Sequence, residues 1–141
     1  MRLPRSSLVI VFVLWLTGLG AAAQFAKVGL VLPELAGLYP NAGPSLGFLV
    51  SSISFVGALL GLFAGSLAAR IGLRRLLLAG LALGSLVSLF QSMGLPISLL
   101  LASRVVEGIS HLAIVVSAPT LVALSSSDRM RAAAMTLAVL V

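Results

Sequence analysis

The chain has 141 residues, of which 60% are hydrophobic and only 9% are charged, and its mean hydropathy is +1.24. Soluble domains carry about 25% charged residues, so this composition argues against a water-soluble globule, including a soluble helical bundle. The net charge of +6 does not indicate nucleic-acid binding, because the basic residues punctuate apolar runs instead of sharing one polar face. The absence of cysteine excludes disulfides, thiol catalysis and Cys-ligated metals.

Apolar stretches in the sequence predict an all-α membrane protein, a polytopic helix bundle. Four transmembrane helices are expected at about residues 8–32, 46–69, 76–90 and 97–124. A fifth apolar stretch occupies residues 132–141, which as a helix would reach only about 15 Å. We therefore expect residues 1–141 to be the partial N-terminal domain of a longer membrane protein. A signal peptide ending near residues 21–23 is the alternative for the first stretch, and both interpretations place residues 33–45 outside.

The arginines predict the orientation in the membrane. Seven of them lie outside the predicted spans: Arg2, Arg5, Arg70, Arg74, Arg75, Arg129 and Arg131. All seven fall on one side of the predicted topology, whereas the turns on the other side, at residues 33–45 and 91–96, contain no Lys or Arg. The positive-inside rule then predicts a multi-pass protein of the cytoplasmic (inner) membrane with a cytoplasmic N-terminus.

The fourth span contains three ionisable residues, Arg104, Glu107 and His111, whose spacing places them along one helical face. An arginine near a helix centre costs about 2.5–3.5 kcal/mol on insertion scales, so it should face protein or water and find a partner. Glu107 is the obvious partner, and His111 has an intrinsic pKa that allows proton exchange near neutral pH. These residues are candidates for a coupling site, and the alternative is a structural Arg–Glu pair with a hydrogen-bonded histidine.

The first span contains Gln24 and Lys27, three residues apart on one face. Lys27 and Arg104 lie at similar distances from the outer ends of their spans, so the two cations could bind an anionic substrate together. The alternative is that Lys27 extends to the outer interface along its aliphatic stem.

Regularly spaced glycines predict close helix packing. In the second span, Gly57, Gly61 and Gly65 are spaced four residues apart, and Gly80 and Gly84 have the same spacing in the third span. Small residues at this spacing let neighbouring membrane helices approach closely. We expect the same of a fourth-span glycine, Gly108.

Two of these patterns resemble signatures of the major facilitator superfamily. The turn between the second and third spans resembles the family's loop pattern Gly-x-x-x-Asp-Arg/Lys-x-Gly-Arg/Lys-Arg/Lys. It matches that pattern at Gly65, Arg70, Gly72, Arg74 and Arg75. Ala69 stands where the family usually has aspartate, and Leu73 where it often has a basic residue. Arg104-x-x-Glu107-Gly108 resembles the family's Arg-x-x-Gln-Gly pattern, with a titratable group in place of the usual glutamine.

The resemblance implies secondary active transport of a small molecule by alternating access, driven by a proton or ion gradient, with the arginine turn as a gating loop. The titratable Glu107 favours a proton as the coupling ion. Members have twelve spans in two halves, of which this chain would supply less than one. The partners implied are the lipid bilayer, the substrate and the missing C-terminal part of the protein, with no cofactor and no metal.

Three alternatives to this transporter remain open. One is a complete four-helix transporter that works as a dimer, and another is a non-transporting membrane scaffold or accessory subunit. A membrane-embedded enzyme is disfavoured, because the chain has no P-loop, dinucleotide fingerprint, metal-spaced histidine cluster or nucleophile elbow.

Overall fold

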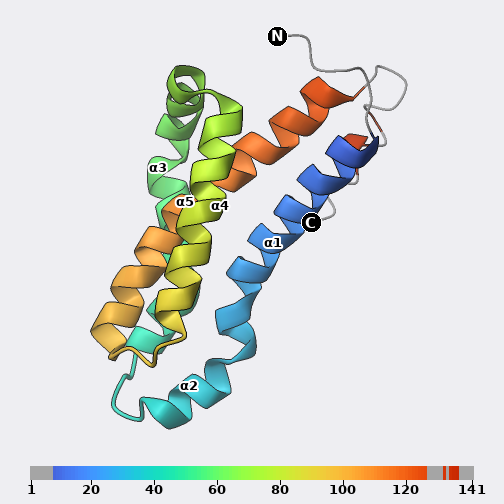
Figure 1. Ribbon diagram of the computed structural model, residues 1–141. Coiled ribbons are helices and arrows are strands. Elements are labelled where there is room, and N and C mark those ends of the chain that lie inside the picture. The colour runs from blue at the N-terminus through green and yellow to red at the C-terminus, as the bar shows by residue number, and fades with distance from the viewer. Residues whose placement is uncertain (1–7, 127–131, 133, 137–141) are drawn as a thin grey trace.

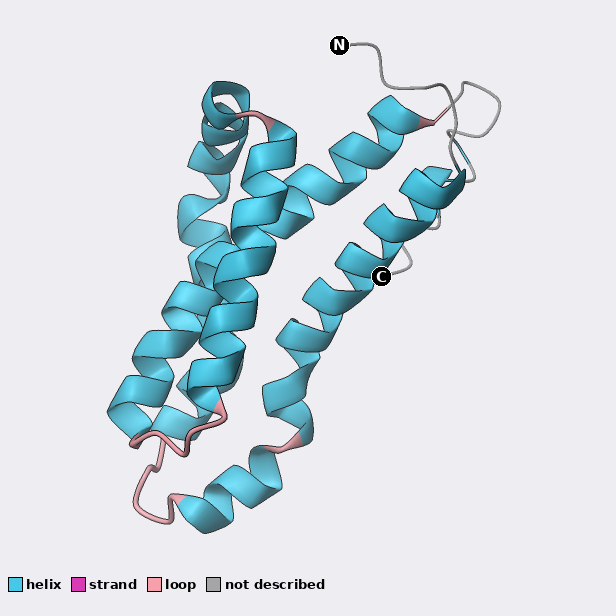
Figure 2. Cartoon of the chain, viewed as in Figure 1, coloured by secondary structure: helices cyan, strands magenta, loops and turns pink. Residues whose placement is uncertain are grey.

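A computed structural model describes residues 8–126, 132 and 134–136. Its helices are α1 (Leu8–Leu30), α2 (Leu32–Leu38), α3 (Ser45–Ile71), α4 (Leu73–Gln91) and α5 (Ile97–Ser125). Short loops join them, and this part of the chain contains no strand (Figure 2). Over the same residues, α1, α3, α4 and α5 are long and apolar enough to cross a membrane. The predicted all-α bundle with four transmembrane helices is therefore confirmed.

Helix α5 is the central element of the bundle, because it packs against each of α1, α3 and α4. The four long helices alternate in direction, so that the start of α1 lies at the same end as the α3–α4 turn (Figure 1). One core cluster joins α1, α4 and α5 to Ala134, which follows α5 in the chain. Its other members are Leu14, Ala21, Leu77, Ile114, Ala118 and Val122. The many large apolar side chains left exposed, such as Leu62 and Phe63 on α3, are those expected of helices that face lipid.

The end of the bundle that contains residues 33–45 differs from the sequence-based expectation. Residues 33–45 are predicted as a turn rich in proline, but the first part of this segment forms the short helix α2. Pro33 is compatible with a helix because it lies in the first turn, where its missing N–H leaves no hydrogen bond unmade. The Tyr39 hydroxyl then donates a hydrogen bond to the Leu95 carbonyl, which ties this segment to the loop between α4 and α5.

The arginine turn is tighter than predicted. Helix α3 continues to Ile71 and α4 begins at Leu73, so the single residue Gly72 joins them. Its φ of 89° lies in a region that side-chain-bearing residues rarely adopt, which explains why glycine is present there. The third span therefore begins earlier than the predicted residue 76, and it carries Arg74 and Arg75 in its first turn.

The predicted packing glycines behave in two different ways. A Cβ at Gly80 would lie 3.0 Å from the Ala113 side chain, one at Gly108 would lie 2.9 Å from Val56, and one at Gly84 would collide with the side chains of Gln24 and Ser110. Gly80 and Gly84 therefore allow α4 to approach α5 and α1 closely, and Gly108 allows α5 to approach α3 closely, as expected.

The stripe on α3 differs. A Cβ at Gly57, Gly61 or Gly65 would meet nothing within 4 Å over the described residues. The spacing of small residues identifies a smooth helix face, but the spacing does not say whether a helix of this segment covers it.

Several predictions fall outside the described residues. Among the residues of the expected fifth span, 132–141, only 132 and 134–136 are described, and these are helical. Four of the seven orienting arginines also lie outside the described residues: Arg2, Arg5, Arg129 and Arg131.

Candidate functional site

A buried carboxylate lies at the centre of the bundle. Glu107 is ten residues from the start of α5, about 15 Å along the helix, which is close to the midplane of an apolar layer about 30 Å thick. Its side chain is fully buried, and each of its oxygens contacts a cation. Lys27 Nζ on α1 lies 2.5 Å from Glu107 Oε1, and Arg104 NH1, one turn away on α5, lies 2.6 Å from Oε2.

Arg104 connects three helices. Its side chain is fully buried, and Nε donates a hydrogen bond of 3.0 Å to the Leu49 carbonyl on α3. NH1 also donates to the Gln24 carbonyl on α1 over 3.3 Å. A helical carbonyl oxygen keeps a second lone pair beyond its backbone hydrogen bond. The Leu49 and Gln24 carbonyls can therefore accept from Arg104, and these contacts lower the cost of burying its guanidinium.

Helix α4 contributes residues that the sequence analysis did not single out. Gln91 Nε2 donates to Glu107 Oε2 over 2.9 Å and to Ser103 Oγ over 3.1 Å. Lys27 Nζ donates to Ser88 Oγ over 3.1 Å. Gln91 is predicted as part of the outer turn because it ends an apolar run, and no spacing rule links it to a residue of α5 sixteen positions later.

We call Lys27, Ser88, Gln91, Arg104 and Glu107 the charge cluster. Lys27 does not extend to the outer interface, because its ammonium turns inward to Glu107 and only 33% of its side chain is exposed. Nor do Lys27 and Arg104 form an open pair of cations, since one carboxylate lies between them. The cluster carries two positive charges and one negative charge, so it keeps one uncompensated positive charge.

His111 and Gln24 lie beside the charge cluster but do not enter it. No hydrogen bond joins His111 to Glu107 in the described part of the chain, and His111 Nδ1 is buried without a partner there. The imidazole ring instead lies 5.8 Å from the Phe25 ring, centroid to centroid. The Gln24 side chain lies against Gly84, and only its backbone carbonyl binds Arg104.

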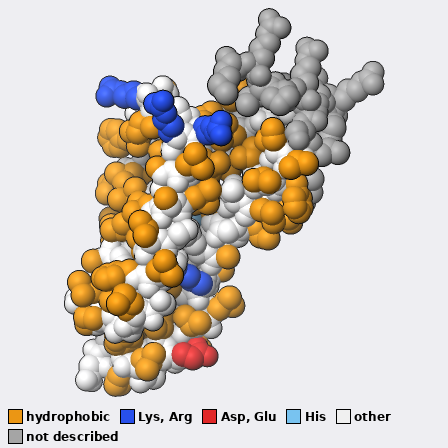
Figure 3. Space-filling view, in the orientation of Figure 1, with side chains coloured by type: hydrophobic (Ala, Val, Ile, Leu, Met, Phe, Trp, Pro, Cys, Tyr) orange, Lys and Arg blue, Asp and Glu red, His pale blue; other side chains and the backbone are white. Residues whose placement is uncertain are grey.

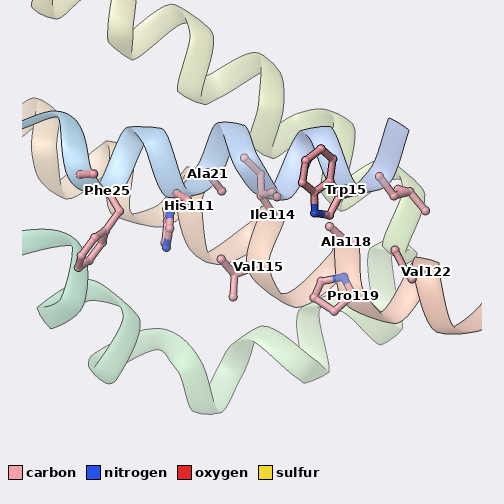
Figure 4. A pocket seen from close by; sticks show the side chains of 13 residues that line it. Trp15, Ala21, Phe25, His111, Ile114, Val115, Ala118, Pro119 and Val122 are labelled. Atoms are coloured by element: carbon pink, nitrogen blue, oxygen red, sulfur yellow. The ribbon is translucent and has the colours of Figure 1, made fainter. Parts of the chain in front are cut away.

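An apolar cavity of about 510 Å³ lies between α1 and α5, and the His111 ring points into it (Figure 4). Its wall is formed by Leu14, Trp15, Gly18, Ala21, Ala22, Phe25, Ala26, His111, Ile114, Val115, Ala118, Pro119 and Val122. None of these side chains is a carboxylate, an ammonium or a guanidinium, although Ala26 precedes Lys27 in the chain. The cavity and the charge cluster therefore lie next to each other along the α1–α5 interface.

The arginine turn lies at the end of the bundle opposite α2. Arg70, Arg74 and Arg75 are exposed, and basic side chains gather at this end of the molecule (Figure 3). None of the three belongs to an ion pair with another described residue. The aspartate expected from the family pattern is replaced by Ala69, so the turn has no neighbouring carboxylate of its own.

Comparisons with known proteins agree with this architecture. The family model described as "Major Facilitator Superfamily" matches residues 4–141, which is nearly the whole chain. No curated protein and no solved structure matches it. The match spans all four transmembrane helices, the arginine turn and the charge cluster, so the chain is a multi-pass membrane protein that belongs to the Major Facilitator Superfamily.

Proposed function

We propose that the protein moves a small molecule across the membrane by alternating access, and that proton exchange at Glu107 drives the movement. The observation that supports this most directly is the burial of one titratable carboxylate near the midplane, bound by residues of three helices. Ionisable groups inside a membrane are costly to keep and are commonly functional.

Protonation of Glu107 would change the contacts between helices. The charged carboxylate binds Lys27 of α1 and Gln91 of α4, and it compensates Arg104 within α5. A neutral carboxylic acid attracts Lys27 far less, so α1 would lose the ion pair that joins it to α5. A proton bound at this position would thus favour a different arrangement of α1 against α5, which is the change that alternating access requires.

The same geometry sets a condition on an anionic substrate. While Glu107 is charged, it compensates Lys27 and Arg104, so an external anion would have to displace it. Once Glu107 is protonated, the two cations lack a counter-ion, and an anion would be attracted. An anionic substrate would therefore enter together with the proton.

Proton flux in proteoliposomes containing the complete protein tests the proposal. Vesicles loaded with a pH-sensitive dye are exposed to panels of sugars, organic acids, amino acids and aromatic compounds. The native protein should move protons in response to at least one solute, and Glu107→Gln should lower this flux at least about tenfold while solute exchange without net proton flux continues. Glu34→Gln is the matched control, because it makes the same chemical change on the exposed helix α2 and should have no effect.

The possible results separate the alternatives. Equal proton coupling in Glu107→Gln and native protein would refute the role of Glu107. Absence of any solute movement by the native protein would refute transport and favour the scaffold or accessory subunit.

We also propose the cytoplasmic membrane, with the N-terminus and the arginine turn in the cytoplasm, because three exposed arginines gather at that end of the bundle. Met93 is exposed in the α4–α5 loop, and Ala69 is exposed beside the arginine turn. A single cysteine at Met93 should react with a membrane-impermeant maleimide from outside the cell, and one at Ala69 from inside. The reverse pattern would overturn this orientation.

A further inference from the structure

The α1–α5 cavity has the size of a binding site for a small organic molecule. Its volume of about 510 Å³ lies within the range of about 300–1,000 Å³ found for drug-sized ligands. On α1 the lining extends from Leu14 to Ala26, twelve residues or about 18 Å. The cavity is therefore an elongated slot along the helix pair.

The chemistry of the wall restricts what can bind there. Three of the lining side chains are aromatic rings, those of Trp15, Phe25 and His111, and nearly all the others are aliphatic. Aromatic rings in contact stabilise each other beyond the apolar area they bury. Two nitrogen atoms of the wall, Trp15 Nε1 and His111 Nδ1, have no hydrogen-bond partner among the described residues.

Charged and polyhydroxylated ligands fit this wall poorly. An ion would lose its hydration without meeting a charged side chain, because the nearest charges, those of the charge cluster, already contact one another. A sugar would bury several hydroxyl groups against aliphatic carbon, and each group left without a partner weakens binding. A molecule with one polar group avoids both losses.

We infer that the α1–α5 cavity binds an uncharged aromatic molecule that carries a single hydrogen-bonding group, with the polar group bound by His111 and the ring extending from there along the slot toward Trp15. This inference rests on the proposed function, since it names the class of substrate that the transporter would carry. His111, which points into the cavity (Figure 4), then acts as the recognition residue, while Glu107 remains the proton site.

Tryptophan fluorescence provides a direct test, because Trp15 is the one tryptophan of the sequence and lines the cavity. The complete protein in lipid nanodiscs is titrated with 3-iodobenzyl alcohol, an uncharged aromatic alcohol whose iodine atom quenches indole on contact. The signal of Trp15 is taken as the difference between the native protein and Trp15→Phe. The charged analogue 3-iodobenzenesulfonate, and glucose as a competitor, represent the excluded classes.

Two neighbouring alanines of α1 offer a matched pair of variants. Ala22 lines the cavity and Ala23 does not, so Ala22→Phe should fill the slot and weaken the quenching at least about tenfold, whereas Ala23→Phe should change it less than about twofold. His111→Ala should weaken binding of the iodobenzyl alcohol about fivefold and leave binding of iodobenzene, which lacks the hydroxyl, unchanged.

Several outcomes would overturn the inference. Equal quenching in native protein, Ala22→Phe and empty-nanodisc controls would mean that the probe only dissolves in lipid. Stronger binding of the sulfonate, or displacement of the alcohol by glucose, would assign the cavity to a charged or sugar-like substrate. If only a sugar or only an ion produces solute-coupled proton flux, the inference is refuted and the transport proposal stands. If the aromatic probe binds but no solute is transported, the transport proposal is refuted and the binding site stands.

Discussion

Removal of the Glu107 charge should destabilise the protein more than removal of the Lys27 charge. The two ion pairs, at 2.5 Å and 2.6 Å, each represent about 6 kcal/mol of attraction at an effective dielectric constant of 20, before desolvation is subtracted. Breaking a buried pair by removing one partner costs about 3–5 kcal/mol, because the other charge is left uncompensated. Glu107→Gln leaves two such cations, one of them, Arg104, fully buried. We therefore expect its free energy of unfolding to fall by about 3–5 kcal/mol.

Lys27→Gln should cost much less, about 1 kcal/mol, because the Arg104–Glu107 pair remains and a third of the Lys27 side chain is exposed. In the double variant Lys27→Gln/Glu107→Gln only one uncompensated cation remains. Its destabilisation should fall short of the sum of the single effects by at least about 1 kcal/mol.

Unfolding of the complete protein by SDS in mixed micelles measures these differences, with Glu34→Gln as a surface control expected within about 0.5 kcal/mol of native. The reasoning is refuted if Glu107→Gln unfolds together with this control, or if the single effects simply add.

The glycines give two further predictions in the same unfolding assay. Gly108→Ala should destabilise by about 1–3 kcal/mol, because its Cβ would lie 2.9 Å from Val56. Gly61→Ala should lose no stability, because its Cβ meets nothing within 4 Å among the described residues. Equal stability of the two variants would contradict the α3–α5 contact. Gly72→Ala should cost about 1–3 kcal/mol because of its φ of 89°. Gly47→Ala, in helix α3, is the control that should not lose stability, because no atom of the described part of the chain lies within 4 Å of its Cβ position.

The sequence predicts those features of the fold that depend on local pattern. Four long apolar runs give four helices, with ends within about three residues of the predicted ones. The Arg104–Glu107 pair is also predictable, because residues three apart on one helix are neighbours. The helix α2 is not predicted, since a proline in a first helical turn and a proline in a loop look alike in sequence.

The rest of the candidate site depends on tertiary structure. Lys27 and Glu107 are eighty residues apart, and only the packing of α1 on α5 brings them together. Depth in the membrane places Lys27 and Arg104 at one level, but it cannot show that a carboxylate lies between them. The glycine stripes have the same limit. Their spacing shows that they share one face of a helix, but it does not show which helix, if any, packs against that face.

The charge cluster and the cavity share the α1–α5 contact, and this has a consequence for the proposed mechanism. Over the described residues, Lys27–Glu107 is the one ion pair that joins two helices, and Lys27 follows Ala26, which lines the cavity. A change in α1 position caused by protonation of Glu107 would therefore alter the cavity walls, and a ligand that spreads those walls would in turn weaken the ion pair. Linkage requires these effects to be equal, so that the factor by which a substrate raises proton affinity equals the factor by which a proton raises substrate affinity. The proposed coupling would then need no long pathway, because the two sites are separated by about one turn of α5, from Glu107 to His111.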